Sequence, residues 1–328
     1  MKQLIKGLAR TVGCCAGLMC ASSAFAQEQI TLKTWWLVND NIPEFISTAK
    51  AEFEALHPNV TIEFEDMPVE AYKTAIQIAL SGSEPPDVFF NWAGEDSARL
   101  ARSGLALDIT DMGGEEGGFG SQISESWQQT MAVDGRIYGV PTDASSKFFF
   151  YNTSFFDEHD IAVPATFEEV VETCKAIRAV DPAIVPLPVG NAERWQIIHY
   201  ITLLNERILG VEGTQADYDL SASEEDLYTD PGYVEALSKL IEMQDADCFQ
   251  DAPNATSYQV AWSMFSSEIS PMIFCGSWCI ATFEKDGFND FALFRFPTVA
   301  GGKSDASTNM VIPQGVQISS KTAHPEMA

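Results

Sequence analysis

Hydrophobic positions in the first third of the chain alternate between strand spacing and helix spacing. Ile30, Leu32 and Thr34 lie on one face of a predicted strand, and positions 46, 49, 53 and 56 follow a helical period. The predicted elements, in chain order, are a strand over 30–36, a helix between Pro43 and Pro58, a strand over 60–65, a helix over 71–80, a strand over 87–90 and a helix that ends at Gly104. This order predicts an α/β lobe with helices on both faces of a sheet.

The rest of the chain predicts a second group of elements that is richer in helices. Thr166 and Glu169 form a capping box at the start of one helix, and Asp134-Gly135 predicts a hairpin turn. The other predicted elements are an aromatic strand over 147–151, helices over 195–209 and 231–246, and a helix, strand and helix over 258–267, 269–274 and 278–284. About 300 residues of this kind favour two lobes over one.

The first 26 residues have the pattern of a signal peptide. Basic residues at positions 2, 6 and 10 precede a short apolar run, and Ala24-Phe25-Ala26 offers a cleavage site before Gln27. The run is too short to span a bilayer, so we expect residues 1–26 to be removed and the protein to be free in the periplasm. A lipid anchor at Cys20 is a weaker alternative, because Met19 is a poor match to the small residue that lipidation needs.

Charge excludes several classes of partner. Without residues 1–26 the chain has 16 basic and 47 acidic residues, a formal net charge of −31. Such a surface repels nucleic acid and anionic lipid, and it disfavours a polyanionic ligand. Hydrophobic residues make up 46% of the chain, which is ample for folded cores and argues against a disordered acidic segment.

Four cysteines remain after the predicted signal peptide: Cys174, Cys248, Cys275 and Cys279. An oxidising periplasm permits one or two disulfides among them, and the sequence leaves their pairing open. The C-x₃-C spacing of Cys275 and Cys279 is not the redox C-x-x-C motif, so we interpret these residues as structural or free.

No constellation in the sequence points to catalysis, a metal or a cofactor. The four histidines are scattered, no G-x-S-x-G elbow is present, and the glycine-rich stretch 113–118 contains two glutamates that would repel phosphate. We therefore expect no catalytic residues, no metal and no cofactor, and predict that the chain is not an enzyme. A secreted carbohydrate-active enzyme stays open as an alternative, and it would need two essential carboxylates and turnover.

Aromatic and polar side chains gather where predicted strands and helices meet loops. Aromatic rings cover the C–H faces of sugars, and carboxylates and amides bind the hydroxyls. A single tryptophan is as often part of a core, but this set at element ends favours a sugar site. No cluster of Arg or Lys adjoins these tryptophans in the sequence, which argues against a phosphate. The candidate binding residues are Trp35, Trp36, Asp40, Asn91, Trp92, Asp143, Trp195 and Trp278.

Motifs spread over nearly the whole chain support a family resemblance. They include Pro86-Asp87-Val88, the stretch from Asp134 to Pro141, Phe150-Tyr151-Asn152-Thr153, Gly276-Ser277-Trp278, and Ile318 to Glu326. In this order and spacing they resemble the extracellular solute-binding proteins of sugar ABC transporters, the maltose-binding-like family. Within it, Trp35-Trp36 and Gly276-Ser277-Trp278 are most similar to monosaccharide binders of the glucose or mannose type.

The resemblance implies an α/β periplasmic binding protein of type II, with two lobes, a multi-strand hinge and a ligand cleft between the lobes. Residues 27–142 and 310–328 are expected to form the N-terminal lobe, and residues 143–309 the C-terminal lobe. Family position puts Trp35, Trp36, Asp40, Asn91 and Trp92 on one wall of the cleft. It puts Trp195 and Trp278 on the other wall, with Asp143 near the hinge.

The expected function is capture of a neutral sugar, a monosaccharide, by a monomer that delivers it to ABC transporter permease subunits in the inner membrane. A polyol, a glycerol phosphate or an oligosaccharide is the alternative ligand. Members of the family continue beyond the position of Ala328 with a helix and a substantial further segment. We therefore expect the 328-residue chain to bind more weakly than a longer form.

Overall fold

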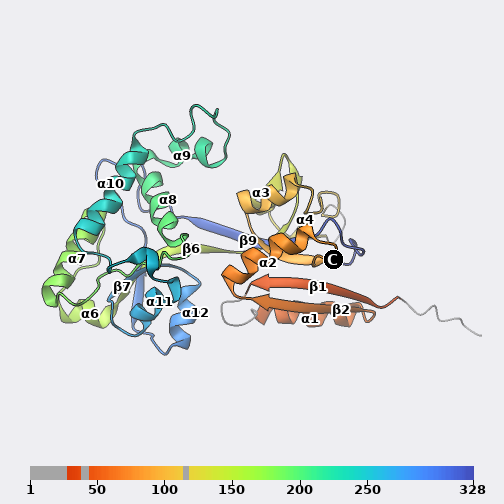
Figure 1. Cartoon of the computed structure of the whole chain (residues 1–328), viewed down its shortest axis with the longest axis horizontal. Helices are drawn as coiled ribbons and strands as arrows, with labels where there is room; N and C mark the ends of the chain where they lie inside the picture. The colour runs from red at the N-terminus through yellow and green to blue at the C-terminus, as the bar shows by residue number, and fades with distance from the viewer. Residues whose placement is uncertain (1–27, 38–43, 114–117) are drawn as a thin grey trace, which may run out of the picture.

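Two lobes lie side by side in the computed structural model, which describes residues 28–37, 44–113 and 118–328 (Figure 1). The predicted signal peptide, 1–26, and the candidate residue Asp40 lie outside the described residues. Two long strands, β6 (Val140–Asn152) and β9 (Val311–Ile318), run from one lobe into the other. This is the two-lobed α/β architecture that the sequence predicts, with the multi-strand connection that the family resemblance implies.

The first lobe follows the alternation of strand and helix that the hydrophobic pattern predicts. Its strands are β1 (Ile30–Leu37), β2 (Val60–Met67) and β3 (Val88–Trp92), and its helices include α1 (Glu44–Leu56), α2 (Val69–Ser81) and α3 (Glu95–Arg102). The strands are parallel in the order β2-β1-β3, and Figure 1 shows α1 on the opposite side of them from α2 and α3. Tyr72 and Phe89 are buried in the core between these layers.

A small hairpin and short helices close this lobe on the side of the connecting strands. They are α4 (Phe119–Gln122), α5 (Glu125–Gln128), a 3₁₀ turn (Gln129–Met131), β4 (Ala132–Val133) and β5 (Arg136–Ile137). Asp134 and Gly135 both have positive φ, 51° and 77°, which is the conformation that the predicted Asp-Gly hairpin turn requires. Arg136 forms an ion pair with Asp108, which ties the hairpin to the segment after α3.

The second lobe is built around the far end of β6. There β6 pairs antiparallel with β7 (Met272–Gly276) and with β8 (Phe291–Phe294). The helices of this part are α6 (Thr153–Glu158), α7 (Phe167–Val180), α8 (Gln196–Leu209), α9 (Val211–Tyr218), α10 (Gly232–Asp245), a 3₁₀ turn (Pro253–Ala255), α11 (Tyr258–Ser266) and α12 (Cys279–Lys285). Neighbouring residues of β6 point to opposite faces, so Phe149 lies in one buried cluster and Phe150 in another.

Local sequence signals explain several boundaries in this lobe. The capping box of Thr166 and Glu169 is present at the start of α7, as predicted. Disulfides join Cys174 to Cys248 and Cys275 to Cys279, which settles the pairing that the sequence left open. The first bond links α7 to the segment after α10. The second spans the loop that carries Trp278.

The connecting strands complete one sheet that runs through both lobes. Within the described residues its order is β2-β1-β3-β9-β6-β7, with β8 paired to β6. Near the first lobe β9 lies between β3 and β6, and the pairing of β6 with β9 ends where its pairing with β7 begins at Lys147. Gly315 of β9 lies very close to β6, because an added Cβ there would be only 2.1 Å from the Val140 carbonyl oxygen. The lobes are therefore joined by two adjacent, hydrogen-bonded strands.

Candidate functional site

Two candidate residues, Trp92 and Asp143, lie on either side of Gln314 where β3, β9 and β6 run side by side. Trp92 is paired with Gln314 of β9, and Gln314 is also paired with Asp143 of β6. A bulge between Pro141 and Asp143 interrupts the regular register at this point. Asp143 has a buried Oδ1 without a hydrogen-bond partner, and burial raises the pKa of its carboxyl, partly opposed by the hydrogen bond with Gln314. The connecting strands thus carry an acceptor without a partner, separated from Trp92 by the intervening strand β9.

A lysine of the first lobe bridges to the second lobe at this site. The Nζ of Lys73, on α2, lies 5.6 Å from the ring centroid of Trp92 and 5.9 Å from that of Trp195. Both separations are in the range of cation–π attraction. The two walls predicted from family position therefore approach each other around Lys73.

In the second lobe, two tryptophans that immediately precede helices lie close together. Trp195 precedes α8 and Trp278 precedes α12, and their ring centroids are 6.4 Å apart. The Trp278 ring lies against the backbone of Gly276, where an added Cβ would be 2.2 Å from the ring, so a side chain there would displace it. Both rings are half-buried, and the Nε1 of Trp195 has no hydrogen-bond partner.

Lys147, which the sequence analysis did not single out, lies directly behind these tryptophans. Its side chain is 0% exposed, and its Nζ is 4.9 Å from the Trp278 ring centroid, 5.8 Å from Trp195 and 5.2 Å from Phe274. The Nζ donates one hydrogen bond, 3.3 Å long, to Oε1 of Gln196. Burial lowers the pKa of this ammonium well below its usual value.

His199 completes the group from the first turns of α8. Its ring centroid is 5.5 Å from that of Trp195 and 6.4 Å from that of Trp278, and its Nδ1 has no hydrogen-bond partner. Burial, together with the charges of Lys147 and Lys73, lowers the pKa of His199 to about 2. The imidazole is therefore neutral at physiological pH and able to donate and accept hydrogen bonds.

Other candidate residues have a packing role in the structure. Trp36 is only 5% exposed and packs edge-on against Phe90, and Trp35 is half-buried against the same core. The buried Asn91 amide donates to Oε1 of Gln317, 2.7 Å away. Hence the rings of Trp92, Trp195 and Trp278 are half-buried, and Asp143 and Trp195 each have a polar atom without a partner, whereas Trp36 and Asn91 are packed or hydrogen-bonded within the first lobe.

The sequence has no cluster of Arg or Lys beside the tryptophans, but the fold brings two lysines to them. Lys73 and Lys147 both lie within 5.9 Å of the Trp195 ring centroid. Lys73 is distant in sequence from every second-lobe tryptophan, so only the fold reveals its position. Lys147 had a detectable signal, because it is a charged residue at the start of a predicted buried strand, next to Phe148, Phe149 and Phe150.

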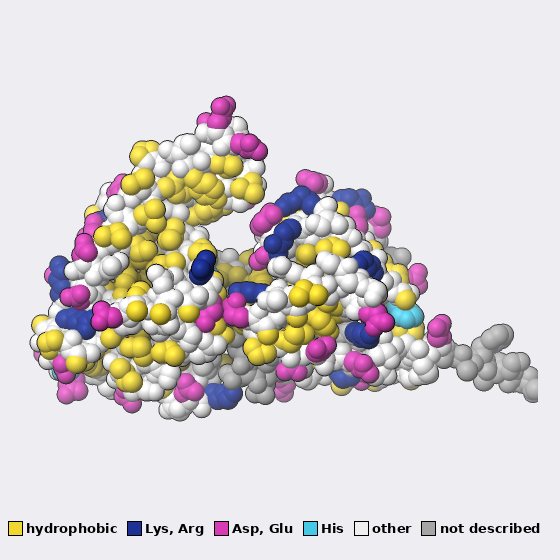
Figure 2. Space-filling view, viewed as in Figure 1, with side chains coloured by type: hydrophobic (Ala, Val, Ile, Leu, Met, Phe, Trp, Pro, Cys, Tyr) yellow, Lys and Arg dark blue, Asp and Glu magenta, His cyan; other side chains and the backbone are white. Residues whose placement is uncertain are grey.

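The surface between the lobes is visibly hollowed. Figure 2 shows a deep recess there, with hydrophobic side chains on its second-lobe side and basic side chains at the junction of the lobes. A second, open hollow follows one face of α2 and is lined by Lys73, Thr74, Gln77, Ile78 and Ser81. It begins at Lys73, so it adjoins the aromatic site.

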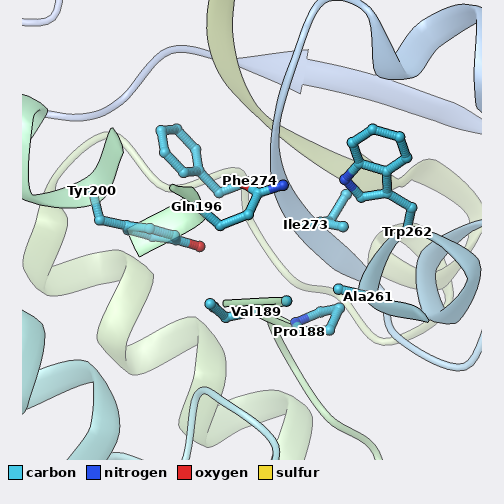
Figure 3. A pocket seen from close by; sticks show the side chains of 9 residues that line it. Pro188, Val189, Gln196, Tyr200, Ala261, Trp262, Ile273 and Phe274 are labelled. Atoms are coloured by element: carbon cyan, nitrogen blue, oxygen red, sulfur yellow. The ribbon is translucent and has the colours of Figure 1, made fainter. Parts of the chain in front are cut away.

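A small enclosed pocket lies inside the second lobe, between α8, α11 and β7 (Figure 3). The hydroxyl of Tyr200 points into it, and Trp262 approaches from the other side; neither polar atom has a hydrogen-bond partner. Of the residues around Lys147, Gln196 and Phe274 also line this pocket. It therefore lies behind the aromatic site rather than within the recess.

The described residues contain no candidate metal cluster and no candidate membrane span. Between residues 28 and 328, apart from the gaps at 38–43 and 114–117, no group of three or more His, Cys, Asp or Glu side chains is arranged to hold a metal ion. Among the helices of those same residues, none combines the length and the apolar character that a membrane span requires.

Comparisons with known proteins agree with this architecture. An uncharacterized ABC transporter extracellular-binding protein of Pyrococcus horikoshii is 26% identical over 92% of this chain and 67% of its own length. The multiple sugar-binding protein of Streptococcus mutans is 23% identical over 83% of this chain and 63% of its own length. The chain thus spans about two thirds of the length of these relatives.

A solved structure from a study of xylan utilization by Caldanaerobius polysaccharolyticus has a similar fold. Its TM-score is 0.80 at 25% identity, with 90% of this chain and 75% of that chain covered. The sequence pattern of one protein family matches residues 39–328, which is most of the chain. The resemblance seen in the sequence is thereby confirmed at the level of the family: the chain belongs to the bacterial extracellular solute-binding proteins.

Proposed function

We propose that this chain is the sugar-binding component of an ABC transporter. The observation that carries the proposal is the set of half-buried rings, Trp92, Trp195 and Trp278, surrounded by polar groups whose hydrogen bonds are incomplete. A pyranose ring has apolar faces that such rings cover and hydroxyls that such groups bind. The buried atoms without a hydrogen-bond partner are the Asp143 Oδ1, the Trp195 Nε1 and the His199 Nδ1.

The number of sugar units is the finer part of the proposal. The sequence favours a monosaccharide, and we propose that the rings of Trp92, Trp195 and Trp278 hold one sugar ring. The hollow along α2 adjoins this group through Lys73 and offers polar side chains, Thr74, Gln77 and Ser81, for further units. The names of the relatives, with multiple sugars for one and xylan utilization for the other, support the oligosaccharide alternative.

Capture and release require the lobes to move, and we propose that residues 27–142 with 310–328 move against residues 143–309. Lys73 contacts rings of both lobes, so ligand that enters between Trp92 and Trp195 binds the closed arrangement better than the open one. A monomer in the periplasm would then present the closed form to permease subunits in the membrane. No step of this cycle changes the sugar chemically.

A thermal-shift screen of the wild-type chain against neutral and acidic mono- and oligosaccharides tests the function. A sugar at about 100 times its Kd adds about 2.7 kcal/mol to the free energy of unfolding, which is a readily measured rise in melting temperature. Chromatography of the sugars after incubation distinguishes a binder from an enzyme. Absence of any shift would refute sugar binding, and new sugar products would establish the enzyme alternative.

A further inference from the structure

Lys147 is a buried cation without a counter-charge. Its side chain is 0% exposed, and none of the ion pairs among the described residues includes it. Aromatic rings of Trp195, Trp278 and Phe274 surround its Nζ, and the amide of Gln196 is its hydrogen-bond partner. An ammonium has three donors, so two of them lack a strong acceptor.

A second cation faces the same place from the other lobe. Lys73 and Lys147 lie 5.9 Å and 5.8 Å from the same Trp195 ring centroid, and both charges lower the pKa of His199. Two ammonium groups that converge on one aromatic ring repel each other. A negative group bound between them would offset the repulsion and would give the buried Lys147 ammonium the partner that it lacks.

We propose that the site takes a saccharide that bears one carboxylate, such as a uronic acid, and that the Lys147 ammonium pairs with this carboxylate. The inference rests on the proposed sugar-binding function and deepens it, and it replaces the neutral ligand that the sequence favours. Lys73 closes over the ligand from the first lobe. The aromatic rings bind the sugar faces, while the charge pair selects acidic sugars from neutral ones.

A carboxylate fits this site better than a phosphate. Many phosphate sites use arginine forks, and no arginine lies at cation–π distance from these rings in the described residues. The strongly negative net charge of the chain also repels a dianion more than a monoanion. A single negative charge is enough to pair with the buried Lys147, because the ammonium of the other lysine, Lys73, is partly exposed to water.

Calorimetric titration with glucuronate, galacturonate, glucose, galactose and glucose 6-phosphate tests this inference. At equal ionic strength the wild type is expected to bind one of the uronates about tenfold or more tightly than its neutral counterpart, the size of a charge-assisted hydrogen bond. Lys147→Met should remove that preference, so that a uronate and its neutral counterpart bind the variant with similar affinity. Lys73→Met should reduce the preference in part.

A second readout separates a charge pair from general damage. Burial lowers the pKa of Lys147 and a bound carboxylate raises it again, so uronate binding should take up protons, measured as a dependence of the binding enthalpy on the buffer. Lys73 and His199 also face the site, and loss of the uptake in Lys147→Met assigns it to Lys147. Lys175→Met serves as the matched control, because Lys175 lies on α7 and pairs with Glu172.

The outcomes distinguish this inference from the proposed function. Neutral sugars that bind as tightly as their uronates, or a preference that survives Lys147→Met, would overturn the carboxylate assignment while leaving sugar binding intact. Glucose 6-phosphate that binds as tightly as glucuronate would overturn the choice of a carboxylate. If neither neutral nor acidic sugars bind at all, the proposed function itself fails.

Discussion

The second lobe contains two fully buried cations, and their surroundings differ sharply. Arg207, near the end of α8, donates five hydrogen bonds: to the carbonyls of Phe296, Pro297 and Thr308, to the Thr308 hydroxyl and to Glu206. Lys147, on β6, donates one bond of 3.3 Å, to Gln196 at the start of the same helix. Both side chains are 0% exposed, so burial alone does not explain the difference.

The contrast separates a structural charge from one available to a ligand. A buried ion is stable when its own fold supplies every partner, as around Arg207. A buried ion without partners is retained at a cost in stability, and such costs concentrate at functional sites. We therefore interpret Arg207 as a clamp on the 296–308 segment, and Lys147 as part of the binding site.

The largest expected effect is a loss of stability on replacing Arg207, whose hydrogen bonds are all made within the protein. Arg207→Met should lower the free energy of unfolding by about 3–5 kcal/mol, because three carbonyls, a hydroxyl and Glu206 lose their donor in a buried place. Urea unfolding followed by circular dichroism measures this change. A loss below about 1 kcal/mol would show that Arg207 does not clamp the fold and would remove the basis of the comparison.

The pH dependence of stability tests the environment of Lys147 through its neighbour His199. Since the pKa of His199 is lowered from 6.5 to about 2, the unfolded chain binds one more proton than the native one between these values. Stability that this group contributes is present above pH 6.5 and falls as the pH falls, by up to about 1.4 kcal/mol per pH unit.

His199→Gln removes the titrating group and should flatten that slope between pH 6.5 and 5. The measurement is the free energy of unfolding of both proteins across this range. The carboxylates and the other histidines contribute equally to the pH dependence of each protein. Parallel curves for wild type and variant would mean that His199 titrates normally and that the site is solvated.

Ligand affinity should depend on the aromatic wall next to Lys147. Trp278→Ala should weaken sugar binding by about 1–3 kcal/mol, the effect of losing an aromatic anchor, whereas Trp127→Ala should not. Trp127 is 39% exposed on α5, and its ring makes none of the site's contacts. Tryptophan fluorescence titration measures both. Equal affinity of Trp278→Ala and wild type would place Trp278 outside the site.

The smallest expected change in stability is that of Lys147→Met at neutral pH. Replacing an unpaired buried lysine by an apolar side chain of similar length should leave the free energy of unfolding unchanged or raise it by about 1 kcal/mol. Because the folded pKa of Lys147 is depressed, the wild type gains stability relative to the variant as pH rises toward 10.5. A large loss of stability in Lys147→Met at pH 7 would assign Lys147 a structural role like that of Arg207.

Local signals in the sequence predict much of the fold. The alternating and helical spacings identify β1 to α3, the Thr166–Glu169 capping box locates the start of α7, and Asp134-Gly135 identifies the hairpin. Each of these depends on residues within a few positions of one another, so a pattern along the chain suffices.

The site is only partly predictable, because its contacts join distant parts of the chain. Trp92, Trp195 and Trp278 could be proposed as binding residues from their places at element ends, but Lys73 meets Trp195 only when the lobes are placed together. For Trp35-Trp36, alternation shows that the two rings face opposite sides of the strand and does not show which side is the core. The cysteine pairing was equally open, since four cysteines allow three pairings.

The most direct test of the account is a crystal structure of the chain with the tightest-binding saccharide from the thermal-shift screen. The account predicts a sugar ring against Trp195 or Trp278, on the side that faces Trp92, with a ligand oxygen about 2.7–3.2 Å from the Nζ of Lys147. The hydrogen bonds of Arg207 should be unchanged. A sugar bound elsewhere, or one that leaves Lys147 without a new partner, would contradict the central claim that Lys147 is unpaired because the ligand pairs with it.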